Sequence, residues 1–404
     1  MKYSTVTFTI PESFRPRAFL SPTLSTYGMQ ANFVMHTLVG RLRYAFEPDR
    51  GAAISQRILR ECGGYRSLHV FKELLQRREI CRKGKAKQTR YWPADHFQPD
   101  RLMRTPCTDR KFAIKLNGKW SELRARKQNE QLRRRRPVHT QWEAWQRRLS
   151  VDVAEMERIL AEIPAASNPY GIQRATLEDI QAGRWRFVID AYGRVHNNIS
   201  NLKTDLRGSL RLNGQRLWGV DISNSQPAFL GLLMLAKPPL VGGFVLSPIW
   251  IEVCDNQPVG RKEDNKYVGV VSSGQLYELL QAESGLDRAT TKRALLRDVF
   301  ARRGRYPSPT RDAFGYYFPD LLRWIDRFNK HDHGALVRHL QRVESEFMIH
   351  LVGRRLALHA DSCSFISLHD GIYTTQECLA CAEAAIQSAA AEIGFRYQAK
   401  SAAT

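Results

Sequence analysis

The chain has 404 residues, of which 43% are hydrophobic, and it carries a formal net charge of +22. This length and hydrophobic share exclude an intrinsically disordered protein and are enough for two or three domains. No stretch approaches the roughly 18 consecutive apolar residues of a membrane helix, so no membrane partner is expected. The N-terminal residues lack the apolar core of a secretory signal, and the seven cysteines indicate no disulfide framework. We therefore expect a cytoplasmic protein with reduced cysteines.

The positive charge is concentrated in the N-terminal part of the chain. Residues 1–150 contain 32 Lys and Arg against 12 Asp and Glu, whereas the remainder contains 30 against 28. Twenty net positive charges in one segment, with aromatic residues among them, indicate a polyanionic partner. Nucleic acid is the first choice. An anionic membrane surface is the alternative, although no amphipathic anchor stands out.

Residues 1–137 are interpreted as a basic, mainly helical nucleic-acid-binding domain. Within it, residues 31–80 have apolar residues at three- and four-residue spacing, which predicts helices. Residues 81–92 predict a basic β-hairpin, and helices followed by such a hairpin suit a winged-helix-like domain. Residues 124–137 predict a basic helix or linker that ends at Pro137. The residues assigned to nucleic-acid binding are Lys83, Lys85, Lys87, Arg90, Arg133, Arg134, Arg135 and Arg136.

Residues 138–404 have the composition of an ordinary globular domain, and their predicted elements indicate an α+β fold. Residues 184–200 predict two strands around a Tyr192-Gly193 turn. Residues 274–304 and 335–360 have helical periodicity, and an alanine-rich helix is predicted near the C-terminus. A second hairpin is predicted from Phe365 to Thr374.

Two acids each follow an apolar strand. Asp221 comes after "LWGV", and Asp370 follows "FISLH" at the turn of the second hairpin. Carboxylates on two strands can meet on one sheet and hold two Mg²⁺ ions, which activate an attacking oxygen and stabilise a leaving one. Mg²⁺ prefers oxygen ligands and keeps several waters, so two carboxylates and a triphosphate suffice. The alternative is that Asp221 caps the helix that follows, because Asp is a favoured N-cap.

A predicted helix between these acids carries two cations and an aromatic ring on one face. Arg288, Lys292, Leu296 and Phe300 are spaced four residues apart. Such a face suits a nucleoside triphosphate, with the cations on the phosphates and the ring near the base. The alternative is an ordinary amphipathic helix with exposed basic residues.

Taken together, these segments resemble the palm and fingers of family A DNA polymerases and the related single-subunit phage RNA polymerases. "LRGSLRLNGQRLWGVDISNSQPAFL" is similar to motif A of that family, "RATTKRALLRDVF" to motif B and "SLHDGIYTT" to motif C. The resemblance covers roughly residues 185–395. It implies a polymerase palm, with an antiparallel sheet and helices, joined to helical fingers.

The resemblance also implies roles for individual residues. Asp221 and Asp370 match the catalytic metal ligands, and the carbonyl of Ile222 matches a backbone ligand. Arg288 and Lys292 match the pair that binds the triphosphate. The implied contacts to primer and template are His369, Gln341, Arg194 and Arg207.

Two residues at the implied nucleotide site depart from the family pattern. Phe300 matches a tyrosine that packs at the nascent base pair, but it lacks the hydroxyl. Gln226 stands where the DNA polymerases have a glutamate that excludes a 2′-hydroxyl. Motif C reads His-Asp-Gly where the family has His-Asp-Glu. The choice between deoxyribose and ribose therefore stays open.

The resemblance implies that residues 138–404 form a polymerase core with four parts. Residues 138–215 would form a short thumb and the start of the palm, and residues 216–235 would contain motif A. Residues 236–330 would form the fingers, and residues 331–404 would complete the palm with motif C.

We predict a template-directed nucleotidyltransferase, first of all a small DNA polymerase of a phage, plasmid or other mobile element. It would be a monomer that uses two Mg²⁺ ions, with Mn²⁺ as an alternative. Its partners would be DNA, as a primer-template or single-stranded template, and dNTPs or NTPs. The alternatives are an RNA polymerase or primase of the same fold, and a non-catalytic DNA-binding replication initiator. A two-metal nuclease would need more clustered acids.

Overall fold

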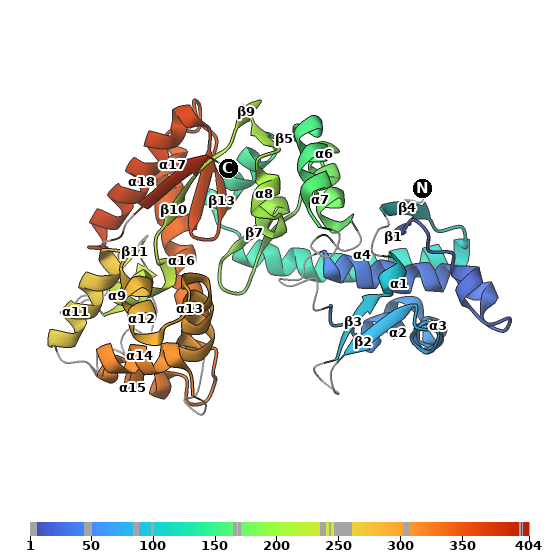
Figure 1. Cartoon of the computed structure of the whole chain (residues 1–404). Coiled ribbons are helices and arrows are strands. Elements are labelled where there is room, and N and C mark those ends of the chain that lie inside the picture. The colour runs from blue at the N-terminus through green and yellow to red at the C-terminus, as the bar shows by residue number, and fades with distance from the viewer. Residues whose placement is uncertain are drawn as a thin grey trace. The chain divides into compact units, whose positions relative to one another are not determined.

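The computed structural model describes residues 6–43, 51–83, 89–97, 101–164, 168, 171–234, 240–241, 244–245, 261–301, 307–395, 397 and 399–403. Lys85 and Lys87 of the predicted basic hairpin lie outside these residues. The chain is α+β and mostly helical (Figure 1). No helix in the described ranges is both long enough and apolar enough to span a membrane.

The chain divides into two compact units. Unit 1 comprises Met1–Arg134, Val151–Trp185 and Asn198–Ser209, and unit 2 comprises Arg135–Ser150, Arg186–Asn197 and Leu210–Thr404. The first break lies close to the predicted boundary at Pro137.

Two segments that the sequence assigned to the polymerase core, residues 151–185 and residues 198–209, belong to unit 1. Ile172 is buried in the hydrophobic core of that unit. A guanidinium N–H of Arg43 donates to the carbonyl of Ala175 at 3.1 Å, and the same group pairs with Asp179 at 2.5 Å. These contacts join segments more than a hundred residues apart, which periodicity along the chain does not reveal.

The N-terminal part of unit 1 combines helices with two small antiparallel sheets. Strand β1 (Thr7–Pro11) pairs with β4 (Leu102–Pro106), and helix α1 (Gly28–Leu42) packs against β1. Helices α2 (Gln56–Gly63) and α3 (Tyr65–Gln76) pack against each other. The predicted helices and the paired strands of the basic hairpin, β2 (Ile80–Lys83) and β3 (Arg90–Pro93), are confirmed.

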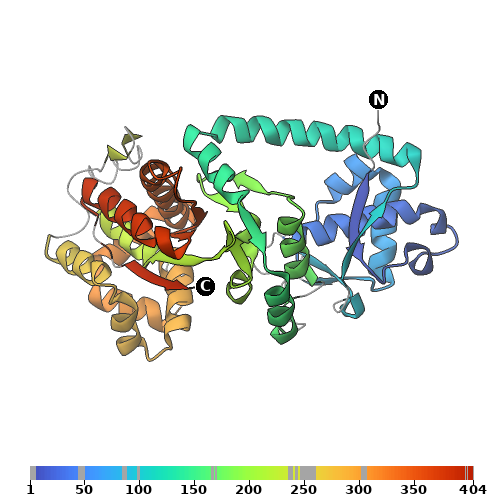
Figure 2. The same ribbon diagram turned by 90° about the horizontal axis from the view of Figure 1, so that it is seen from above.

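Helix α4 (Arg110–Arg134) is one continuous helix of 25 residues (Figure 2). Its first half buries Phe112 and Leu116, whereas residues 124–130 are exposed. The segment predicted as a basic helix or linker is therefore helical as far as Arg134. Pro137 does not end this helix but begins the next one, because proline suits the first turn of a helix.

The described residues of unit 1 also form further α-helices and several 3-10 turns. The helices are α6 (Val153–Glu162), α7 (Ile172–Gln181) and α8 (Thr204–Arg207). The turns are Pro16–Phe19, Ser25–Tyr27, Asp95–Phe97 and Asn198–Asn201.

Unit 2 contains a four-stranded antiparallel sheet in the order β13-β14-β10-β15. The hairpin β13 (Ile366–Leu368) and β14 (Gly371–Thr374) pairs with β10 (Trp218–Ile222), which pairs in turn with β15 (Ala399–Ala403). Helix α18 (Leu379–Glu392) packs on β10 and β14 (Figure 1). The second predicted hairpin and the C-terminal helix are thus confirmed.

The other elements of unit 2 are mostly helices. They are α5 (Pro137–Gln146), α9 (Ser225–Leu233), α11 (Arg261–Ser272), α12 (Leu276–Ser284), α13 (Arg288–Ala294), α14 (Pro309–Tyr317), α15 (Pro319–Phe328), α16 (Ala335–Ser345) and α17 (Gly353–Ala357), with π-helices at Leu295–Phe300 and Glu346–Val352 and a 3-10 turn at Gln376–Cys378. The remaining strands are β5 (Leu149–Val151), β6 (Phe187–Ile189), β7 (Val195–Asn197), β8 (Leu210–Leu212), β9 (Gln215–Arg216), β11 (Leu240–Val241) and β12 (Phe244–Val245).

One disulfide corrects the expectation of reduced cysteines. Cys363 and Cys378 are joined, with their Cα atoms 5.8 Å apart. Cys363 precedes β13 and Cys378 follows β14, so the hairpin brings the two thiols together. Their spacing along the sequence does not reveal this pairing, because it depends on the register of the two strands.

Candidate functional site

The fold places the backbone segments that carry the two predicted catalytic acids next to each other. Asp221 of β10 lies opposite Gly371 of β14, and the backbone N–H of Ile222 donates to the carbonyl of Asp370 at 3.3 Å. A Cβ atom added to Gly371 would lie 1.9 Å from Oδ1 of Asp221, so the carboxylate lies directly over the Gly371 backbone. Asp221 lies in β10, whereas Asp370 lies in the turn that precedes β14, the antiparallel neighbour of β10.

Asp221 does not cap the following helix. The N-cap of α9 is Asn224, which has a φ of 52° and makes no side-chain capping hydrogen bond to the described residues. Asp221 is exposed and Asp370 is half-buried. Both carboxylates are therefore accessible to a ligand from solvent, and the capping interpretation of Asp221 is wrong.

Polar side chains without partners follow Asp221. Asn224 is 7% exposed, and among the described residues neither its amide nitrogen nor its amide oxygen has a hydrogen-bond partner. The same holds for the hydroxyl of Ser223 and for Oε1 of Gln226. Burying a polar group without a partner is costly, so such a cluster indicates that a water, ion or ligand completes it.

The acid pair suits a hard, hydrated cation. Within the described ranges, no group of three or more His, Cys, Asp or Glu side chains could hold a metal ion. Asp221 and Asp370 would therefore supply two carboxylates, and backbone carbonyls, water and a phosphate-bearing substrate would have to supply the other oxygens. That ligand set fits Mg²⁺ or Mn²⁺ and not a structural zinc ion.

A buried ion pair lies beside the acids. The Glu344 side chain is 2% exposed and forms an ion pair of 2.7 Å with Nη2 of Arg194. Burial raises the pKa of Glu344 to about 7; Arg194 opposes this shift, and the charges of Asp370 and Asp190 add to it. The Arg194 side chain is 15% exposed and paired with Glu344, which leaves little of it open to a primer or template. The reason is that the β6–β7 turn packs closely on α16, where a Cβ on Gly193 would lie 3.3 Å from Ser345.

A chain of two histidines and another acid begins at His369, the neighbour of Asp370 in the sequence. His369 has a φ of 54°, and its ring centroid lies 6.0 Å from that of His196. Nε2 of His196 lies 3.0 Å from Oδ2 of Asp190. Burial raises the pKa of Asp190, but hydrogen bonds from His196 and from two backbone N–H groups lower it overall. Sequence analysis did not assign functional roles to Asp190 and His196. Their spacing across a tight turn is the signal that pairs them.

Tyr277 is a further residue that sequence analysis missed. It is buried in α12, and the guanidinium carbon of Arg288 lies 5.2 Å from its ring centroid. Burial raises the pKa of Tyr277 to about 12; the charge of Arg288 opposes this shift and that of Asp370 adds to it. Tyr277 therefore lies within electrostatic reach of both Arg288 and Asp370.

Arg288 and Lys292 are exposed on α13, one turn apart, as expected. The expected position of Phe300 on the same face is wrong. Its side chain is 0% exposed and packs against Phe314, with ring centroids 6.4 Å apart. The helix changes to π geometry at Leu295, and the wider π turn shifts every later residue around the axis. Phe300 is a core residue, and its ring is not available to a base.

Two further predicted contacts to primer and template belong to different compact units. Gln341 is half-buried on α16 in unit 2, the unit of the acid pair. Arg207 belongs to α8 in unit 1, where its guanidinium donates to the carbonyl of Leu202 at 3.4 Å. The structure therefore places Arg207 in a different unit from the two acids.

The basic residues predicted to bind nucleic acid differ in their exposure and in their ion pairs. Lys83 and Arg90 are exposed and lie opposite each other in the β2–β3 pair, and Arg133 is exposed on α4. The other three arginines of the run are held in ion pairs by acids. These pairs are Arg134–Glu130, Arg135–Glu143 and Arg136–Glu346.

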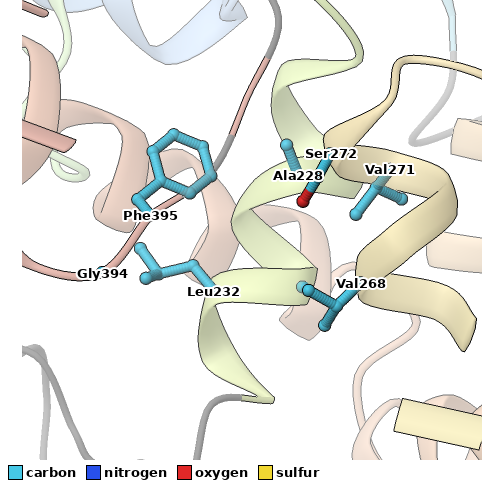
Figure 3. A pocket seen from close by; sticks show the side chains of 8 residues that line it. Ala228, Leu232, Val268, Val271, Ser272, Gly394 and Phe395 are labelled. Carbon is cyan, nitrogen blue, oxygen red and sulfur yellow. The ribbon is translucent and has the colours of Figure 1, made fainter. Parts of the chain in front are cut away.

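A small apolar pocket lies apart from the acids (Figure 3). Its volume is about 240 Å³, which is below the usual range of about 300–1,000 Å³ for ligand pockets. Its lining consists of Ala228, Gly231, Leu232, Val268, Val271, Ser272, Gly394 and Phe395. None of the described lining residues is charged, so the pocket offers nothing to a triphosphate.

No protein-family model matches this chain, and no curated protein matches it in sequence. The interpretation of the site therefore depends on its own residues and geometry.

Proposed function

We propose that this protein is a template-directed nucleotidyltransferase, a small DNA polymerase with a palm-like sheet and helical fingers. The observation that carries the proposal is the register of β10 and β14, which places the Asp221 carboxylate over Gly371, next to Asp370. Asp221, Asp370 and the Ile222 carbonyl would hold two Mg²⁺ or Mn²⁺ ions. Bound ions would lower the pKa of an attacking hydroxyl and stabilise the leaving pyrophosphate.

The protein's own groups would position and neutralise the substrate. The 3′-oxygen of a primer forms a bond to the α-phosphorus of the nucleotide as the bond to pyrophosphate breaks. Arg288 and Lys292 bind the charged triphosphate, and Tyr277 holds Arg288 in place through its ring. Glu344 and Arg194 hold the β6–β7 turn beside Asp370. Positioning and preorganised charge would supply most of the rate enhancement.

The test is nucleotide incorporation by the full-length protein with Mg²⁺ and a primed DNA template. Asp221→Asn and Asp370→Asn should each lower the rate by about 1,000-fold or more, because each removes charge stabilisation worth several kcal/mol. Asp361→Asn, which changes an exposed acid of the same unit, should leave the rate unchanged. DNA binding by all three variants should match the parent. Incorporation by either site variant at the parental rate would contradict the proposal.

A second candidate is an RNA-synthesising enzyme of the same kind, a primase or RNA polymerase. It is favoured by Gln226, whose uncharged amide stands where the DNA polymerases have a carboxylate. Unprimed templates with NTPs distinguish the two enzymes, because synthesis under those conditions identifies a primase or RNA polymerase. DNA binding without incorporation under any of these conditions would indicate a non-catalytic initiator.

A further inference from the structure

Helices α2 and α3 of unit 1 form a helix–turn–helix pair with a very short turn. Gly64, with a φ of 81°, is the one residue between them. A Cβ on Gly63 would lie 2.1 Å from the Ser67 hydroxyl and 2.6 Å from the ring of Phe33. The Ser67 hydroxyl donates to the Gly63 carbonyl at 3.0 Å. The two glycines thus allow α3 to pack closely against α1 and α2.

Helix α3 has one buried and one exposed face. Tyr65 is 68% exposed at its start, and Arg66, His69 and Lys72 follow on the exposed face. Arg66, His69 and Lys72 are three residues apart and Tyr65 is four residues before His69, so these side chains share one face of the helix. The buried face consists of Ser67, Val70, Phe71 and Leu74.

The basic hairpin is anchored to α3. Tyr91 of β3 packs its ring against Phe71 of α3, with centroids 5.2 Å apart. The backbone of Tyr91 also exchanges two hydrogen bonds with Ala52, at 2.8 and 2.9 Å. The contact between Tyr91 and Phe71 holds the hairpin against α3. The exposed Lys83 and Arg90 of the hairpin are therefore fixed relative to that helix.

The charge of this region indicates its partner. Residues 55–93 contain eleven Lys and Arg against three Glu. One of the three, Glu73, accepts hydrogen bonds from the backbone of Ser21 and from Arg77. An α-helix with its side chains, about 10–12 Å across, fits the major groove of B-DNA, which is about 12 Å wide. The major groove of an RNA duplex is too narrow for a helix to read.

We propose that α3 is a recognition helix that reads a specific double-stranded DNA sequence in the major groove. The side chains of its first turns, Tyr65, Arg66 and His69, contact base edges, and Lys72 with the hairpin cations contacts phosphates. This inference rests on the nucleic-acid-binding part of the proposed function and is independent of its chemistry. It gives the protein a defined DNA site at which synthesis begins.

The experiment selects preferred sequences from a pool of random DNA duplexes with the full-length protein. Binding of the enriched duplex and of its scrambled version is then compared by fluorescence anisotropy at one salt concentration. The parent should prefer the enriched duplex. Arg66→Ala should lower that preference by roughly 5- to 150-fold, because one side chain that reads a base discriminates on that scale. Arg126→Ala, at an exposed position of α4, should weaken binding to both duplexes equally.

A second variant separates base reading from folding. The Arg66 guanidinium carbon also lies 4.8 Å from the ring centroid of Tyr27, whereas His69 has no such described contact, so His69→Ala should lower the preference without disturbing that packing. The inference is overturned if no sequence is enriched, if both variants keep the parental preference, or if RNA duplexes or single strands bind more tightly than the enriched DNA. Nucleotide incorporation on a saturating primed template is measured in parallel. Failure of the DNA preference with normal incorporation would leave the proposed function standing.

Discussion

At the scale of single residues, the absence of a side chain at Gly371 is as important as the presence of one at Asp221. The Asp221 carboxylate occupies the space that any Cβ at position 371 would need. A glutamate side chain at this position would not fit over β10 as it is arranged here. The glycine after Asp370 therefore matches its neighbour, because the Asp221 carboxylate uses the space that a side chain at position 371 would need.

Gly371→Ala should abolish incorporation, because its Cβ would lie 1.9 Å from Oδ1 of Asp221 and would displace the carboxylate. The loss should approach that of Asp221→Asn, while the circular dichroism spectrum and DNA binding stay close to the parent. The matched control is Gly269→Ala in α11, where an added Cβ meets no described atom within 4 Å. Near-parental incorporation by Gly371→Ala would show that the Asp221 carboxylate need not occupy this position.

Gln226 should control the choice of sugar. It is half-buried, with a buried Oε1 that has no partner among the described residues, and it is nearly isosteric with glutamate. The parent should therefore prefer dATP over ATP, by roughly 10- to 200-fold in kcat/KM. Gln226→Ala should remove most of this preference by opening space for the 2′-hydroxyl. A parent that already prefers ATP would instead identify Gln226 as a ribose-binding residue.

At the scale of elements, changes in helix geometry and long-range packing decide which side chains reach the site. The π segment after Ala294 rotates the Phe300 side chain toward the core, whereas Arg288 and Lys292 stay exposed on the preceding α-helical turns. The π segment Glu346–Val352 packs against α5, where the rings of His139 and His350 lie 5.0 Å apart. Both segments carry core residues that an uninterrupted α-helical period would place elsewhere.

The His139–His350 contact should make unit 2 sensitive to acid. Burial, the nearby charge of His350 and other cations lower the pKa of His139 to about 4; burial and the charges of Arg136 and Arg354 lower that of His350 to about 3. Unfolding returns both to about 6.5, so the unfolded chain binds more protons below that pH. The stabilisation is complete above pH 6.5 and is lost as the pH falls toward 4 and below. Between pH 6.5 and its pKa in the folded protein, each histidine should lower the free energy of unfolding by about 1.4 kcal/mol for each pH unit of acidification.

The measurement is the free energy of unfolding of unit 2 in urea at pH 7 and at about pH 5. Tryptophan fluorescence reports it, because the buried Trp142 and Trp145 lie in α5. His350→Gln should reduce the loss of stability between the two pH values by about 2 kcal/mol. His359→Gln, at an exposed position of the same unit, is the control. An unchanged pH dependence in His350→Gln would contradict the assignment of this acid sensitivity to His350.

At the scale of the whole molecule, the charge and the acid pair lie on different compact units. Unit 1 contains the exposed basic hairpin, α3 and α4, and unit 2 contains Asp221 and Asp370. Deleting residues 1–137 would not separate these parts cleanly. Residues 151–185 would lose the core around Ile172 and the ion pair between Arg43 and Asp179.

Charge reversal on α4 tests, without deleting any residue, whether unit 1 supplies DNA affinity and unit 2 supplies the chemistry. Arg126→Glu combined with Lys127→Glu should lower DNA affinity and reduce the slope of log Kd against log salt by about 1 for each phosphate that the protein no longer neutralises. Incorporation at saturating template should be unchanged. The matched control, Lys330→Glu in unit 2, should alter neither affinity nor slope. An unchanged slope in the α4 variant would place the phosphate-binding surface elsewhere.

The sequence by itself determined the local elements and the order of the chemical groups. Apolar runs ending in Asp221 and Asp370 predict strands with acids at their ends, since strand and turn preferences depend on near neighbours. The exposed pair Arg288 and Lys292 could be predicted for the same reason, because it lies within one regular helical turn.

Only the tertiary structure decided which of those groups meet. The register of β10 and β14 places Asp221 over Gly371, the π turn buries Phe300, and the ion pair with Glu344 occupies Arg194. The Cys363–Cys378 disulfide and the composition of unit 1 likewise depend on contacts between distant segments. Such contacts are set by the packing of the whole core, which pairwise spacing along a single chain does not encode.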